Sequence, residues 1–98
     1  MKILALSREL PGVTAEQYPP LLKAEALRAW ELHQLGVVRE LYFREDIAEV
    51  VLVLECATLE EAGAALASLP LAQAGLIAFD LISLRAYDGF ARLFNPEL

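Results

Sequence analysis

The chain has 98 residues, a formal net charge of −6 at pH 7 and 57% hydrophobic residues. This length predicts one domain. Because its Lys and Arg residues are scattered, the sequence has no basic face for nucleic acid or for an anionic membrane surface, and no apolar run reaches the ~18 residues of a membrane span. The single Cys56 cannot form an internal disulfide, which favours a cytoplasmic location.

The hydrophobic fraction predicts self-association. Soluble domains are usually about 45–50% apolar, and a chain this small buries only ~60–70% of the surface that its unfolded form exposes. Burial between subunits is the simplest place for the remaining apolar surface. We therefore expect a homodimer or a higher multiple of this chain.

The first part of the chain predicts a strand and a turn. Residues 2–8 form a short apolar run that ends before Pro11, as is typical of a strand. Thr14 with Gln17 three residues later matches a capping box. Because two prolines follow at once, and proline is accepted only in the first turn of a helix, residues 14–18 are expected to form a separate turn.

The middle of the chain predicts a helix followed by two strands. The main helix is expected to begin at Pro19 and to stop at Gly36, a residue suited to the left-handed position after a helix. Residues 37–44 and 49–55 read as the second and third strands. The third is apolar on both faces, so both sides of its sheet must be covered.

The last third predicts a helix and a strand. Thr58 opens a second capping box, and an amphipathic helix follows it to about Leu69. Pro70 is expected to end that helix, because proline has no backbone N–H and its ring strikes the preceding turn. Residues 72–75 then read as a short connector, and residues 76–84 as the fourth strand.

The element order β-α-β-β-α-β predicts an α+β, ferredoxin-like fold with both helices on one face of a four-stranded sheet. Two such sheets laid face to face would close into a dimeric α/β barrel. We expect a single domain over residues 1–98 with a C-terminal tail over about residues 88–98. In that tail, Phe90, Leu93 and Phe94 share helical spacing and are expected to dock on protein.

Several positions together carry a resemblance to a known family. They are Leu22, Glu25, Leu32 and Gly36, the Leu-Tyr-Phe-Arg strand at 41–44, the apolar strand ending in Glu55, and the Leu-Pro-Leu at 69–71. Over residues 21–84 the chain resembles the muconolactone isomerase-like group of the dimeric α/β barrel superfamily. The resemblance implies a small homo-oligomer that binds apolar or aromatic acids and lactones between helix and sheet. The isomerases of that group shift a proton without a cofactor.

Two polar residues are candidates for catalysis. At about 100° per residue, Glu25 and His33 fall on the apolar half of the first helix. A carboxylate there is costly to desolvate unless it is paired, and burial raises its pKa toward the range of a general base. The alternative is a structural ion pair of Glu25 with an arginine at 39, 44 or 85. His33 is either a titrating group near neutral pH or a packing residue.

Candidates for substrate binding come from the helix and two strands: Trp30, Tyr42, Arg44, Phe79 and Asp80. A guanidinium offers a planar fork to an anionic ligand. The alternative for Tyr42 and Arg44 is cross-strand pairing with Glu49, Glu55 or Asp80. Trp30 and Phe79 could instead serve as core. One His and one Cys make no metal-ligand spacing, so no metal and no cofactor are expected.

Two classes of function follow. One is a cofactor-free enzyme, an isomerase or a monooxygenase, that acts on a small lactone or aromatic acid with Glu25 as its base. The other is a non-catalytic ligand-binding or assembly module with the same pocket.

Overall fold

The computed structural model describes residues 1–95 and 97. A single antiparallel sheet has the strand order β2-β3-β1-β4. Its strands are β1 (Lys2–Glu9), β2 (Val38–Phe43), β3 (Val50–Glu55) and β4 (Ile77–Leu84). The α-helices are α1 (Leu22–Gln34), α2 (Leu59–Ala67) and α3 (Pro70–Gln73), and short 3-10 turns span Ala15–Gln17, Pro19–Leu21 and Gly89–Leu93. This order and pairing confirm the α+β, ferredoxin-like prediction.

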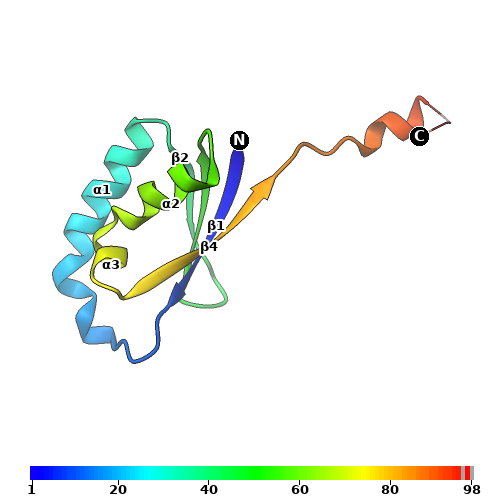
Figure 1. Ribbon diagram of the computed structural model, residues 1–98. Helices are drawn as coiled ribbons and strands as arrows, with labels where there is room; N and C mark the ends of the chain where they lie inside the picture. Colours follow the sequence, from blue (N-terminus) through cyan, green and yellow to red (C-terminus); the bar gives the residue numbers. More distant parts are fainter. Residues whose placement is uncertain (96, 98) are drawn as a thin grey trace.

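All three α-helices lie on one side of the sheet (Figure 1). The opposite side carries no helix in the described part of the chain, and we refer to it as the open face. Cross-strand pairs assign the side chains to the two faces, because paired residues point the same way. Leu4, Val51 and Ile82 belong to the open face, whereas Ala5 and Leu52 point toward the helices.

The start of α1 differs from the prediction. Pro19 and Pro20 form a 3-10 turn, and the α-helix begins only at Leu22. Two adjacent prolines supply no backbone N–H, so they suit a tight entry turn better than the body of a helix. The predicted end is confirmed: Gly36 follows the helix with a φ of 77°. The separate turn expected over residues 14–18 is also present, as a 3-10 turn.

The predicted connector after the second helix is wrong. Helix α2 opens at Thr58, whose side chain accepts the N–H of Glu61, and it ends at Ala67. Pro70 then begins the new helix α3 instead of leading into an irregular connector. Proline is well suited to the first position of a helix, because the N–H it lacks would have no partner there. The same residue therefore separates two helices.

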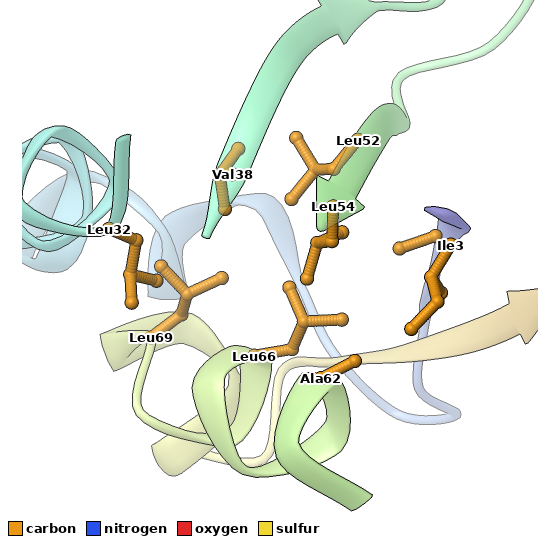
Figure 2. Close-up of a cluster of buried hydrophobic side chains, with 9 residues drawn as sticks. Ile3, Leu32, Val38, Leu52, Leu54, Ala62, Leu66 and Leu69 are labelled. Atoms are coloured by element: carbon orange, nitrogen blue, oxygen red, sulfur yellow. The ribbon is translucent and has the colours of Figure 1, made fainter. Parts of the chain in front are cut away.

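The core lies between the helices and the sheet. Figure 2 shows Leu32 of α1 beside Leu69, below Val38 of β2, and Leu66 of α2 below Leu54 of β3. These side chains are at most 3% exposed. Each fully buried aliphatic side chain stabilises the fold by roughly 1.5–3 kcal/mol relative to exposure. This cluster holds one end of α1 on the sheet.

A bulge in β2 sets which of its side chains face the helices. Val38 pairs with Leu54, but the register shifts by one residue before Glu40 pairs with Val53. One extra residue reverses the alternation of side chains along a strand. As a result, Leu41 and Phe43 point to the helix side, although they are an odd number of residues from Val38.

The C-terminal segment leaves the body of the protein. In Figure 1 the end of β4 and the residues after it run away from the sheet, and the longest dimension of the chain is 58 Å. Phe90, Leu93 and Phe94 are 67%, 75% and 85% exposed. Tyr87 packs edge-on against Phe90, with ring centroids 5.0 Å apart. The docking of this tail stays a prediction, and it requires another molecule as the partner.

Candidate functional site

A cleft of about 860 Å³ opens between α1 and the helix-facing side of the sheet. It exists because α1 is held to the sheet mainly at Leu32, while its earlier turns stand away. The first half of the helix therefore presents side chains to a cavity instead of to core. Most of the lining is aliphatic or aromatic. The polar groups in it are Ser7, Tyr18, Glu25, His33, Tyr42 and Glu49.

Glu25 faces this cleft from the first turns of α1. Its Oε1 accepts a hydrogen bond of 2.9 Å from the backbone N–H of Leu71, at the start of α3. Burial raises the pKa of Glu25, and the Leu71 N–H lowers it by a smaller amount. No ion pair among the described residues includes Glu25, so the predicted alternative of an arginine partner is not found. Its carboxyl group is thus partly desolvated and held at one oxygen.

A second carboxylate closes the cleft on the sheet side. Glu49, just before β3, accepts a 2.5 Å hydrogen bond from the hydroxyl of Ser7 and a 3.0 Å bond from the backbone N–H of Glu9. Ser7 Oγ in turn accepts the N–H of Val50 at 2.8 Å. Ser7 is only 7% exposed. Its hydroxyl therefore orients Glu49 and satisfies a strand N–H at the same time.

The hydroxyl of Tyr18 extends this polar network. It donates to Glu9 Oε2 at 2.9 Å. Burial raises the pKa of Tyr18 to about 12, and the carboxylate of Glu9 adds to that effect. The phenol therefore stays protonated throughout the physiological pH range and acts as a fixed hydrogen-bond donor.

His33 and Trp30 lie farther along α1 at the other end of the cleft. The His33 Nδ1 is 2.8 Å from the carbonyl oxygen of Val38. Because a carbonyl oxygen only accepts, Nδ1 carries the proton, and in a neutral ring Nε2 is an acceptor. The rings of Trp30 and His33 are 6.0 Å apart. Trp30 is 57% exposed, so it forms a wall of the cleft and is not part of the core.

The candidate binding residues on the sheet divide into two groups. Phe79 of β4 lines the cleft, as does part of Tyr42. However, Tyr42 pairs with Val51, so its side chain belongs to the open face, where its hydroxyl donates to Glu40 at 2.5 Å. In the described part of the chain, no side-chain hydrogen bond or ion pair joins Tyr42 to Glu49, Glu55 or Asp80, the partners predicted as the alternative.

Arg44 and Asp80 are not brought to the cleft. Arg44 forms two hydrogen bonds, of 2.9 and 2.5 Å, with the carboxylate of Asp46 in the adjoining loop. Asp80 pairs on the open face with Arg8, at 3.2 Å. Both charged groups thus have local partners away from Glu25.

Sequence reasoning overlooked Ser7 and Glu49 as site residues. Ser7 is the polar exception in an otherwise apolar alternation with Ile3 and Ala5, all on the helix-facing side of β1. A hydroxyl among buried aliphatic residues needs a partner, and that signal could have found it. Glu49 appeared only as the first residue of a strand and as a possible cross-strand partner of Tyr42 and Arg44, and its actual partner lies 42 residues away in the sequence.

Within residues 1–95 and 97, no three His, Cys, Asp or Glu side chains are grouped as metal ligands would be. No helix in the same residues is long and apolar enough to cross a membrane.

Comparison with solved structures yields a match over nearly the whole chain. The matched protein is 5-chloro-2-hydroxyhydroquinone dehydrochlorinase (TftG) from Burkholderia phenoliruptrix AC1100, in complex with 2,5-dihydroxybenzoquinone. The TM-score is 0.72 at 15% sequence identity, and the match covers 91% of this chain and 98% of that chain. The two proteins share a fold. No protein-family model and no curated protein matches the sequence.

At 15% identity this likeness shows the fold alone, and it agrees with the ferredoxin-like strand order described above. At this identity it does not extend to the finer muconolactone isomerase-like family. That finer assignment stays a hypothesis resting on the sequence resemblance.

Proposed function

We propose that this chain binds a small ring compound in the cleft beside α1 and transfers a proton on it without a cofactor, with Glu25 as the base. The resemblance to muconolactone isomerase-like enzymes implies a small lactone or aromatic acid as the substrate class, which the charges of the cleft narrow in the next subsection. One observation carries the proposal: Glu25 is a partly desolvated carboxyl group that faces a cavity whose lining, among the described residues, contains no arginine or lysine.

The reaction proposed for Glu25 is the transfer of one proton between two carbons. The carboxylate would take a proton from a carbon next to a carbonyl group, leaving the electron pair as an enolate, and would return the proton at another carbon. A raised pKa suits this cycle, because the group must both accept and release the proton near neutral pH. The Leu71 N–H holds Oε1. Oε2, which has no such bond among the described residues, is the oxygen assigned to the proton.

The other predicted residues serve in binding. Trp30 and Phe79 offer aromatic surfaces to a ring, and Tyr42 adds to the edge of the cleft. His33 would accept a hydrogen bond at Nε2 from a hydroxyl of the ligand, since its Nδ1 is held by the Val38 carbonyl.

We further propose that two copies pair through their open faces and close the barrel. This face carries a group of aliphatic side chains: Leu4, Leu6, Val51, Val53, Ile82 and Leu84. Ile82 and Leu84 are 44% and 40% exposed in one chain. A contiguous apolar face of this kind typically marks an interaction surface.

The decisive experiment follows proton transfer directly. We would incubate small butenolides and cyclic enones with the protein in heavy water and measure deuterium uptake at carbon by NMR. The wild-type protein should accelerate exchange in at least one compound. Glu25→Gln should abolish this acceleration and keep binding, measured by the fluorescence of Trp30, the single tryptophan. Glu60→Gln, an exposed change on α2, is the matched control.

If compounds bind but the wild-type protein accelerates exchange in none of them, the cleft belongs to a binding module and not to an isomerase. Loss of binding and stability together in Glu25→Gln would assign Glu25 a structural role.

A further inference from the structure

The fixed charges around the cleft are all negative. Apart from the titratable imidazole of His33, the charged side chains in its lining are the carboxylates of Glu25 and Glu49. No lysine or arginine is present in that lining, counted over residues 1–95 and 97. A cavity that is to hold a carboxylate ligand normally supplies a cation or several backbone N–H groups aimed at it.

The cations of the chain have other partners or positions. Arg8 pairs with Asp80 on the open face, and Arg44 pairs with Asp46. Arg28 donates to Ser68 at 2.9 Å, and Arg39 to the carbonyl of Gly36 at 2.5 Å. The other four are outside the lining: Lys2, Lys23, Arg85 and Arg92.

The two carboxylates also differ in how many further hydrogen bonds each can accept. Glu49 already receives hydrogen bonds from the hydroxyl of Ser7 and the N–H of Glu9. Glu25 receives one, from Leu71, which leaves it room for another donor. Nearby, the Tyr18 hydroxyl is directed to Glu9 and away from a ligand. Apart from the indole N–H of Trp30, the polar groups that remain for a ligand are acceptors, so the ligand should bring at least one hydrogen-bond donor.

Taking the proposed binding role as given, we propose that the ligand of this cleft is an aromatic or alicyclic molecule without a negative charge that carries at least one hydroxyl donor, and that carboxylate ligands are excluded. A carboxylate would lose its hydration beside two acidic groups with no cation to replace it. An ammonium would lose hydration too, but it could form a charge-assisted hydrogen bond with Glu25, so the carboxylates of the cleft disfavour anions and not cations. A neutral hydroxyl loses the least hydration and finds Glu25 and His33 as acceptors.

Three matched probes separate these cases: 3-hydroxybenzyl alcohol, 3-hydroxybenzoate and 3-hydroxybenzylamine share one ring and differ in charge. Titration calorimetry with the full chain at pH 7 should show the alcohol binding about tenfold or more tightly than the benzoate, since a like charge at close range costs at least that factor. The amine should also bind more tightly than the benzoate, because the fixed carboxylates of the lining attract its charge and repel that of the benzoate.

Variants test the cause. Glu49→Gln removes one negative charge and should narrow the ratio of alcohol to benzoate affinity, whereas Glu60→Gln should leave it unchanged. An unchanged ratio in a folded Glu49→Gln protein overturns the assignment to Glu49. If that variant does not fold, the ratio measured with the wild-type protein still decides whether carboxylates are excluded.

The outcomes also separate this inference from the proposed function. If the benzoate binds as well as the alcohol or better, the charge inference is overturned while the cleft remains a binding site. Benzoate binding that is lost in Arg85→Ala or Arg92→Ala would overturn it too, by showing that the tail of another copy supplies the cation. If none of the three probes binds at millimolar concentration, both the inference and the proposed binding role fail.

Discussion

The backbone N–H of Leu71 holds Glu25 Oε1 at 2.9 Å, so a helix that begins at Pro70 positions the candidate base on α1. The two residues are 46 positions apart. Since a hydrogen bond to a carboxylate favours its charged form, this contact counteracts part of the effect of burial. The proline that was expected only to end a helix thus contributes to the site.

The pKa of Glu25 gives a prediction about stability. Burial raises it above the unfolded value of about 4.3, so the protonated carboxyl group favours the folded chain. This contribution is complete below the unfolded pKa and is lost as the pH rises through the folded pKa. As the pH rises through that interval, the wild-type protein loses this contribution and Glu25→Gln does not. The free energy of unfolding of Glu25→Gln should therefore increase relative to that of wild type, as measured by urea denaturation at several pH values.

The free energy of unfolding of Glu60→Gln should depend on pH in the same way as that of wild type, because Glu60 is exposed on α2. Carboxyl-carbon NMR gives the pKa itself. A titration of Glu25 at or below the ordinary glutamate value would contradict its role as base and favour the binding-module alternative.

Ser7→Ala should destabilise the protein by roughly 1–3 kcal/mol, because it leaves the N–H of Val50 and one oxygen of Glu49 without their partner. Thermal and urea denaturation measure this loss. The control is Ser83→Ala on exposed β4, where we expect a change within about 0.5 kcal/mol. If Ser7→Ala changed the free energy of unfolding as little as Ser83→Ala does, the Ser7 hydroxyl would contribute nothing to stability.

Charge on the open face should prevent self-association. Val51 and Val53 stand on that face between β1 and β2. Changing both to lysine should give a folded monomer by sedimentation and circular dichroism, because the helix-facing core is untouched. Lysines at Ala57 and Ala64, both exposed, should leave assembly intact. A wild-type protein that sediments as a monomer at micromolar concentration would end this proposal.

The exposed aromatic residues of the tail permit a separate test. Changing Phe90, Leu93 and Phe94 to alanine removes side chains that are each at least 67% exposed in one chain. If the tail docks on another copy, the triple variant should dissociate at higher concentration and melt at lower temperature than wild type. If size and melting temperature are unchanged, the tail is an appendage.

Local signals in the sequence were enough for the order of elements. Apolar periodicity distinguished strands from helices, Thr58 marked the start of α2, and Gly36 marked the end of α1 with its φ of 77°. Each of these signals depends on residues within a few positions of each other. The ferredoxin-like topology and the position of Glu25 on the inner side of α1 followed from them.

The tertiary structure alone decided which polar groups meet. The register of β1 and β3 brings Ser7 to Glu49, and the bulge in β2 turns Leu41 and Phe43 toward the helices. Arg44 forms hydrogen bonds with Asp46, two residues away, and not with a residue of the cleft. Hydrogen bonds between distant residues depend on register and on where a helix stands off the sheet. The periodicity of one segment specifies which face a side chain occupies. It does not specify the register between strands or the position of a helix over the sheet, and so it does not show which residue lies opposite.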